Sequence, residues 1–65
     1  MLSKNLKIFR KRKGLTQENV AEALNVVRQT ISKWEKGISV PDADMLIRLA
    51  EILDVSVNEL IGSDI

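Results

Sequence analysis

A chain of 65 residues provides one small domain with a thin hydrophobic core. It has no Cys, which excludes disulfides and thiolate zinc ligands, and no His, the commonest metal ligand and general base near neutral pH. No apolar run reaches the roughly 18 residues that span a bilayer, and residues 1–14 lack the apolar core of a secretory signal. We therefore expect a cytoplasmic protein that is stabilised by packed helices and binds no metal, cofactor or membrane.

The net charge of +1 conceals a strong asymmetry along the chain. Residues 1–36 contain nine Lys or Arg and three Glu, a net charge of +6, while residues 37–65 contain one Arg and six Asp or Glu, a net charge of −5. A basic half joined to an acidic half favours one face that attracts phosphates. Charge alone leaves open the alternative that these side chains only solvate the surface.

The first predicted helix covers about residues 3–13. Leu2, Leu6 and Phe9 are spaced by four and then three residues, which places them on one apolar stripe of a helix. Gly14 follows, and Gly commonly ends a helix because it adopts the left-handed conformation without strain.

A second helix is predicted to begin after Thr16, a good N-cap residue. Val20, Ala21 and Leu24 supply its buried side. Asn25 follows, and Asn tolerates the left-handed conformation of a sharp turn better than any residue except Gly. The segment therefore predicts a short helix that ends in a tight turn.

The third predicted helix, about residues 28–35, has two contrasting sides. Ile31 and Trp34 are three residues apart and point into the core, and Gly37 ends the helix. The opposite side carries hydrogen-bonding side chains, namely Arg28, Gln29, Ser32 and Lys33. Two short helices joined by a tight turn, the second with an apolar back and a polar front, are typical of a helix-turn-helix DNA reader.

Two further helices complete an all-α chain. Pro41 and Asp42 mark the start of the fourth, about residues 42–53, whose apolar positions have helical spacing: Leu46, Leu49, Ala50 and Leu53. Ser56 and Glu59 fit a capping box at the start of the fifth, whose apolar face is Val57, Leu60 and Ile61. No segment alternates strongly enough to predict a strand. We expect a compact five-helix domain over residues 1–65, with the helix-turn-helix at about residues 16–37.

The front of the third helix has side chains that can read bases. Each base pair displays its own pattern of donors and acceptors in the major groove, where Arg can bond bidentately to guanine and Gln to adenine. Arg28 and Gln29 in the first turn, and Lys33 one turn further along, are therefore candidate base readers. The alternative, that polar residues merely cover a surface helix, stays open for this helix taken alone.

The segment TQENVAEALNVVRQTISKWEKG resembles the Cro/CI-type (XRE-like) helix-turn-helix family, which contains the lambdoid phage repressors and many small bacterial regulators. The similarity extends over nearly the whole chain, from LKIFRKRKGLTQ to PDADMLIRLAEILDVSVNEL, and includes the spacing of Gln17, Ala21, Ile31 and Glu35. It implies a five-helix lambda-repressor-like fold. It also implies a sequence-specific transcriptional regulator of bacterial or phage origin, with repression as the favoured mode.

The resemblance also implies roles for individual residues. In family members the first residue of the second helix holds a DNA phosphate, and Gln17 occupies that position here. Arg10 and Glu35 match a family ion pair between the first and third helices. We expect further contacts with the DNA backbone from polar and basic side chains in and around the motif: Thr16, Thr30, Ser32, Lys36 and Ser39.

Val27 departs from the family pattern, which usually has Ser or Thr at this position as the cap of the third helix. Val cannot accept that hydrogen bond, and we expect capping to lose about 0.5–2 kcal/mol relative to Ser. Val27 either packs locally, which we favour, or contacts a thymine methyl group. Asn25 and Asp54 stand where the family commonly has Gly, and both tolerate the left-handed backbone.

We expect the protein to bind double-stranded DNA as a homodimer, because one short helix reads too few base pairs to select a site. The candidate interface is the fifth helix and the tail, with Val57, Leu60, Ile61 and Ile65. The alternative is that the first three of these residues only close the core of the monomer.

The rival function is a protein-interaction module, such as an antitoxin-type regulator that binds a protein partner through the acidic segment 42–64. An enzyme is not expected, since no Ser, Lys or carboxylate falls in a nucleophile or phosphate-loop motif.

Overall fold

The computed structural model describes residues 1–62. Its helices are α1 (Leu2–Arg12), α2 (Gln17–Leu24), α3 (Arg28–Lys36), α4 (Ala43–Leu53) and α5 (Val57–Ile61). No strand occurs within residues 1–62, so the predicted all-α, five-helix fold is confirmed. The boundaries that the sequence predicted agree with these helices to within one residue. No helix in this part of the chain is long and apolar enough to cross a bilayer.

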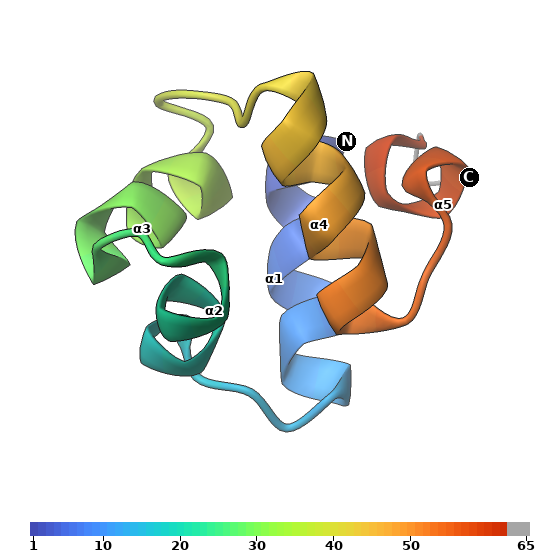
Figure 1. The fold of residues 1–65 in the computed structure, drawn as a ribbon. Coiled ribbons are helices and arrows are strands. Elements are labelled where there is room, and N and C mark those ends of the chain that lie inside the picture. Colours follow the sequence, from blue (N-terminus) through green and yellow to red (C-terminus); the bar gives the residue numbers. More distant parts are fainter. Residues whose placement is uncertain (63–65) are drawn as a thin grey trace.

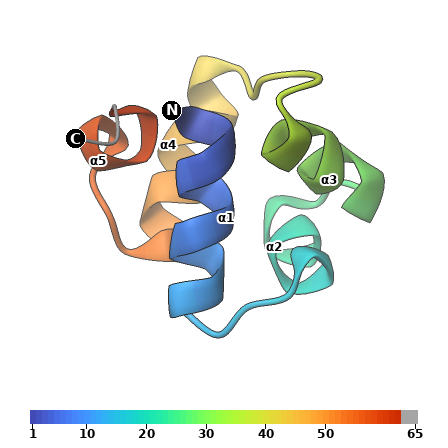
Figure 2. The same ribbon diagram turned by 180° about the vertical axis from the view of Figure 1, so that it is seen from behind.

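The helices form two flanks around a central pair. α1 packs against both α3 and α5, while α4 packs against both α2 and α5. α1 and α4 therefore occupy the middle of the molecule, with α2 and α3 on one side and α5 on the other (Figures 1 and 2). This arrangement leaves the outer surface of α3 uncovered by any other helix and places it on the opposite flank from α5.

Each of the five helices contributes buried side chains to the core. α2 supplies Val20, Ala21 and Leu24, the three residues predicted from its apolar spacing. Ala21 is fully buried in α2, which packs against α3. The remaining members of the core are Leu6 of α1, Ile31 and Trp34 of α3, Leu49, Ala50 and Leu53 of α4, and Leu60 of α5. Burying one such large apolar side chain contributes about 1.5–3 kcal/mol, so the fold depends on these contacts.

Reciprocal side-chain caps begin α2 and α5. At α2, the Asn19 backbone N–H donates to Thr16 Oγ1 at 3.0 Å, and the Thr16 N–H donates to Asn19 Oδ1 at 2.9 Å. At α5, the Glu59 N–H donates to Ser56 Oγ at 3.0 Å, and the Ser56 N–H donates to Glu59 Oε1 at 2.9 Å. The bond from the Ser56 N–H lowers the pKa of the Glu59 carboxyl group. The predicted capping box is therefore present.

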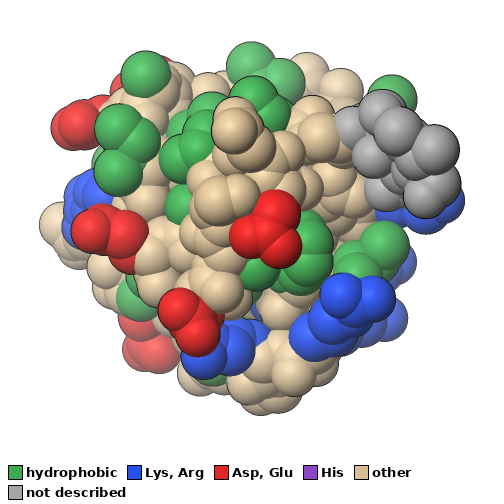
Figure 3. Space-filling view, turned by 90° about the vertical axis from the view of Figure 1, so that its right-hand side faces the viewer, with side chains coloured by type: hydrophobic (Ala, Val, Ile, Leu, Met, Phe, Trp, Pro, Cys, Tyr) green, Lys and Arg blue, Asp and Glu red, His purple; other side chains and the backbone are tan. Residues whose placement is uncertain are grey.

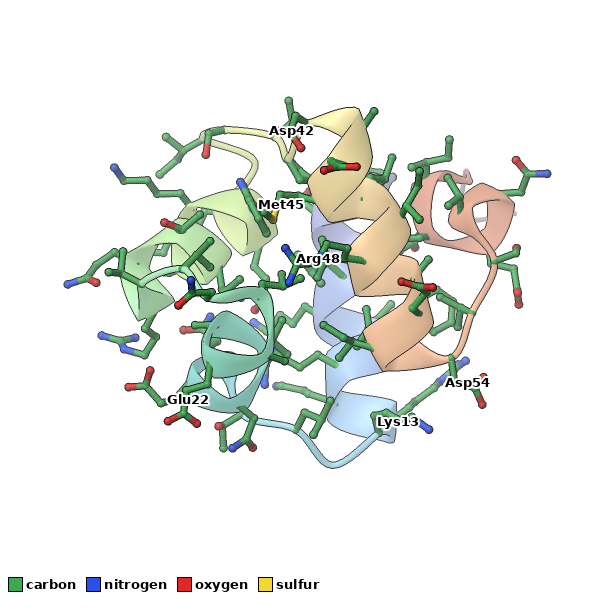
Figure 4. The ribbon with its side chains drawn as sticks, in the orientation of Figure 1. Lys13, Glu22, Asp42, Met45, Arg48 and Asp54 are labelled. Carbon is green, nitrogen blue, oxygen red and sulfur yellow. The ribbon has the colours of Figure 1, made fainter. Side chains whose placement is uncertain are left out.

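The turns between helices use the residues that the sequence singled out. Asn25 and Asp54 end α2 and α4 in the left-handed conformation, with φ of 59° and 57°. Gly37 ends α3 in the same way, with φ of 74°. Asp42 begins α4 by accepting the Met45 backbone N–H at 2.9 Å (Figure 4). These local features set the directions in which successive helices leave one another.

Asn5 is a structural residue that the sequence analysis missed. It is buried in α1, and its side-chain amide donates to the carbonyl oxygens of Leu60 at 3.1 Å and Gly62 at 2.7 Å, and more weakly to that of Glu59 at 3.3 Å. A helix end leaves its last carbonyl groups without partners, and Asn5 supplies donors to those of α5. The Met1 amino group donates to the same Gly62 oxygen at 2.5 Å. The first helix thus fastens the last one.

Replacing Asn5 with Ala should lower the free energy of unfolding by about 1–3 kcal/mol, because buried carbonyl groups lose their donor. Urea unfolding followed by circular dichroism measures this change. Asn58, exposed on α5, provides the control, and Asn58→Ala should stay within about 0.5 kcal/mol of the original chain. Equal stability of the two variants would show that Asn5 does not hold α5.

Candidate nucleic-acid interface

The outer surface of α3 forms a shallow hollow. Six residues line it: Arg28, Gln29, Ser32, Lys33, Lys36 and Ile38. The structure therefore brings together the three predicted base readers and two of the predicted backbone-contacting residues. Three of the six are cations and none is a carboxylate, so the hollow has the charge that attracts an anionic ligand.

The opposite side of α3 fixes this surface in place. Ile31 and Trp34 are buried in the core. The turn before α3 is closed by backbone bonds, since the Val26 N–H donates to the Ala21 carbonyl at 2.9 Å and the Asn25 N–H donates to that of Glu22 at 3.1 Å. The apolar back of α3 thus holds its polar front toward solvent.

The ion pair that the resemblance implied lies behind this surface. Arg10 Nε donates to Glu35 Oε2 at 2.6 Å, and Arg10 Nη2 donates to Glu35 Oε1 at 3.2 Å. The two side chains are only 10% and 4% exposed. Arg10 Nη1 also donates to the Leu15 carbonyl at 2.8 Å, so the guanidinium is committed to the interior. Arg10 joins α1 to the end of α3, and its guanidinium is directed away from the surface that would face DNA.

Gln17 has protein partners on both sides of its amide group. Gln17 Nε2 donates to Glu35 Oε1 at 3.1 Å, and Gln17 Oε1 accepts a hydrogen bond from Arg28 Nη1 at 3.2 Å. The first residue of α2 therefore links the last turn of α3 to its first residue. Sequence reasoning assigned Gln17 only to a phosphate and missed these bonds, because they depend on how α2 and α3 cross.

The other residues predicted to contact the DNA backbone lie on α3 or next to the ends of α2 and α3. Thr16 is exposed at the start of α2, where it also serves as the cap. Ser32 and Lys36 line the hollow on α3, and Ser39 is exposed in the loop that follows. Thr30 is half-buried and does not line the hollow. Their contacts with DNA stay predictions.

The interpretation of Val27 as a packing residue is wrong. Val27 is 64% exposed, whereas its neighbour Val26 is half-buried and packs against the core. Val27 is the N-cap residue of α3, and no side chain there accepts a helix N–H, as expected for Val. An unpacked aliphatic side chain therefore stands at the tip of α3, beside Arg28.

The structure corrects one residue of the predicted dimer interface. Leu60 is completely buried within the monomer, because α5 turns this side chain into the core, so it is not available to a second copy. Val57 is half-buried against the core, while Ile61 is 47% exposed. Ile65 lies outside the described residues. Figure 3 shows that hydrophobic, acidic and basic side chains all lie on the side of the molecule that carries α5.

Few other features of the surface suggest a chemical site. Lys13 and Asp54 form an exposed ion pair at 3.9 Å between the ends of α1 and α4, and such pairs contribute little to stability (Figure 4). Within residues 1–62 no group of three or more acidic side chains is arranged to hold a metal ion. The hollow on α3 is the surface that combines position, charge and base-reading chemistry.

Comparisons with known proteins agree with this geometry. A family model described as helix-turn-helix matches residues 6–60. The chain is 44% identical over 64 residues to the uncharacterized HTH-type transcriptional regulator YqaE of Bacillus subtilis (strain 168), a match that covers 98% of this chain and 55% of that protein. It is 38% identical over 63 residues to the HTH-type transcriptional regulator ImmR of the same organism, covering 97% and 50%. The chain thus spans about half the length of these curated relatives.

Among solved structures, the fold matches the biofilm master regulator SinR in a crystal structure with DNA. The TM-score is 0.86 at 30% sequence identity, and the match covers 95% of this chain and 100% of that one.

Replacing Arg10 with Met should lower the free energy of unfolding by about 3–5 kcal/mol, because the buried Glu35 carboxylate loses its counter-charge. The double variant Arg10→Met/Glu35→Leu should recover part of that loss, since no unpaired charge is left behind. Urea unfolding tests both, and Lys11→Met, an exposed change on the same helix, should differ from the original chain by less than about 0.5 kcal/mol. A double variant no more stable than Arg10→Met would contradict this account of the pair.

Proposed function

Because the chain belongs to the helix-turn-helix family, we propose that it is a sequence-specific transcriptional regulator that binds double-stranded DNA through α3. The observation that carries the proposal is the outer face of α3, where three cations and Gln29 line one hollow without a carboxylate. Residues 1–65 act as one DNA-binding domain, in the cytoplasm of a bacterium or encoded by a phage. Of the two modes of regulation, we favour repression, in which the bound domain blocks transcription.

The docking geometry follows from which end of α3 carries the base readers. A recognition helix enters the major groove with its N-terminal residues against the base edges. Arg28 and Gln29 are the first two residues of α3, and Lys33 lies one turn further along the same hollow. With this docking, we expect Thr16 at the start of α2 and Ser39 after α3 to contact the flanking phosphates. A crystal structure of SinR, which has the same fold at 30% identity, in complex with DNA supports DNA binding by this fold.

The protein binds its operator as a homodimer. α3 has nine residues, so it is about 13 Å long and spans only about four base pairs. Two copies on half-sites about one helical turn apart would read enough base pairs to select a site. Ile61 on α5 is the exposed apolar side chain of the predicted interface, and Val57 beside it is partly accessible.

Selection of bound duplexes from a random pool, with the 65-residue chain at moderate salt, should recover an inverted repeat. Arg28→Ala and Gln29→Ala should each relax the preference at one position of the half-site, at a cost of about 1–3 kcal/mol. Asn58→Ala, far from α3 on α5, should select the same sequence as the original chain. Affinity should also fall steeply as salt rises, because phosphate contacts release counterions.

Two outcomes of this selection would count against the proposal. Folded protein that selects no sequence at any salt concentration would favour the rival function, a module that binds a protein partner. Unchanged selection by both α3 variants would show that another surface reads the DNA.

The interface is tested by Ile61→Lys, which places a charge on the exposed apolar position of α5. The variant should bind a duplex with two half-sites with lower affinity and without cooperativity, while its affinity for a single half-site should not change. Sedimentation of the protein–DNA complexes measures how many chains bind each duplex. Two bound chains with undiminished cooperativity would exclude Ile61 from the dimer contact.

A further inference from the structure

We propose that Glu35 and Gln17 are positioning residues for Arg28, so that an ion pair in the protein interior sets the geometry of a base-reading side chain. The inference rests on the proposed reading of DNA by α3. It adds a role for two residues that need not touch a base. Four side chains from α1, α2 and α3 form the path: Arg10, Glu35, Gln17 and Arg28.

The path begins with the Glu35 carboxylate, which Arg10 holds in place from the protein interior. Glu35 has a side chain only 4% exposed, and Arg10 donates to both of its oxygens, at 2.6 and 3.2 Å. A bidentate pair between a guanidinium and a carboxylate fixes the plane and the direction of both groups. Glu35 Oε1 therefore lies at a defined place near the start of α2, where it accepts from Gln17 Nε2 at 3.1 Å.

The chemistry of the two neighbours dictates which way the Gln17 amide points. An ionised carboxylate can only accept hydrogen bonds, so it must face the Gln17 NH₂ group. The Gln17 oxygen then points to the other side, toward Arg28, whose guanidinium can only donate. The reversed amide would place oxygen against carboxylate and NH₂ against guanidinium, and both contacts would be repulsive. Glu35 thus sets the orientation of Gln17, and Gln17 Oε1 in turn accepts from Arg28 Nη1 at 3.2 Å.

This bond leaves Arg28 able to read a base. A guanidinium has five N–H donors, and the bond to Gln17 uses one of them. A bidentate contact with guanine needs two of the remaining four. Holding a long side chain near its bound position before DNA arrives reduces the ordering cost of binding, an effect of about two- to tenfold in affinity.

Gln29 provides an internal comparison. Within residues 1–62, the Gln29 side chain has no hydrogen-bond partner, although it lines the same hollow as Arg28. Loss of the Gln17 amide should therefore affect the base pair read by Arg28 and leave the base pair read by Gln29 unchanged. A role for Gln17 as a phosphate ligand makes the opposite prediction, because a lost phosphate contact weakens binding to all sequences and lowers the salt slope by about one.

The experiment compares discrimination ratios. Arg28→Ala and Gln29→Ala first identify the base pair that each residue reads in the selected operator. The dissociation constant is then measured for that operator and for duplexes with either base pair replaced, with the original chain, Gln17→Met and Gln17→Ala. Met keeps the length of the side chain without its amide, and Ala is the best helix former, so at least one variant should keep the fold when checked by circular dichroism.

We expect replacement of the Arg28 base pair to weaken binding of the original chain by about tenfold to a hundredfold. In both Gln17 variants this ratio should fall by about two- to tenfold, while the ratio for the Gln29 base pair stays the same. In the Arg28→Ala background, the same Gln17 changes should leave both ratios unaltered.

Three results would overturn the inference. A uniform loss of affinity on all duplexes would make Gln17 a phosphate ligand, and unchanged ratios in both Gln17 variants would deny it a positioning role. Either result leaves sequence-specific binding by α3 intact. If no base pair depends on Arg28 in the original chain, the proposed assignment of Arg28 fails together with the inference.

Discussion

The ion pair between Arg10 and Glu35 is the constraint on which the rest of the structure depends. It connects the last turn of α1 to the last turn of α3, and these two helices pack against each other. Both groups are nearly excluded from water. An unpaired charge in such a buried site would be very unfavourable, so each group requires the other. The same guanidinium also holds the Leu15 carbonyl, which orders the chain just before α2 begins. One pair of charges thus ties α1 to α3, which carries the candidate interface, and to the chain just before α2.

α3 can present hydrogen-bonding side chains to solvent because its two sides differ in composition and burial. Ile31 and Trp34 on the back supply the packing, so the polar side chains on the front are not needed for stability. This separation allows Arg28, Gln29 and Lys33 to stay accessible on a rigid element. On the opposite flank, Asn5 holds α5 by a hydrogen bond and Leu60 is buried in the core. Only part of the apolar face of α5 is therefore accessible.

The sequence predicted the features that depend on local rules. Helical spacing identified the core residues of α2, and the left-handed turns at Asn25 and Asp54 followed from side-chain chemistry. Features that depend on how distant segments meet were missed or assigned incorrectly. Asn5 contacts carbonyl groups more than 50 residues away, and no local pattern announces that contact. Leu60 and Ile61 are adjacent apolar residues in a helix of five residues, so spacing could not decide which one the core would bury.

At Val27 the sequence predicted the missing helix cap correctly but the surroundings of the side chain incorrectly. Side-chain caps begin α2, α4 and α5, but α3 has none, so the helix with the proposed base-reading residues starts with weaker local stabilisation than its neighbours α2 and α4. The sequence predicted the missing cap correctly, yet it favoured packing as the use of the side chain, and packing is excluded by its 64% exposure. An exposed aliphatic group contributes favourable free energy only when a partner removes it from water. The alternative use of Val27 that the sequence analysis gave, contact with a thymine methyl group, is therefore the one that stays a prediction.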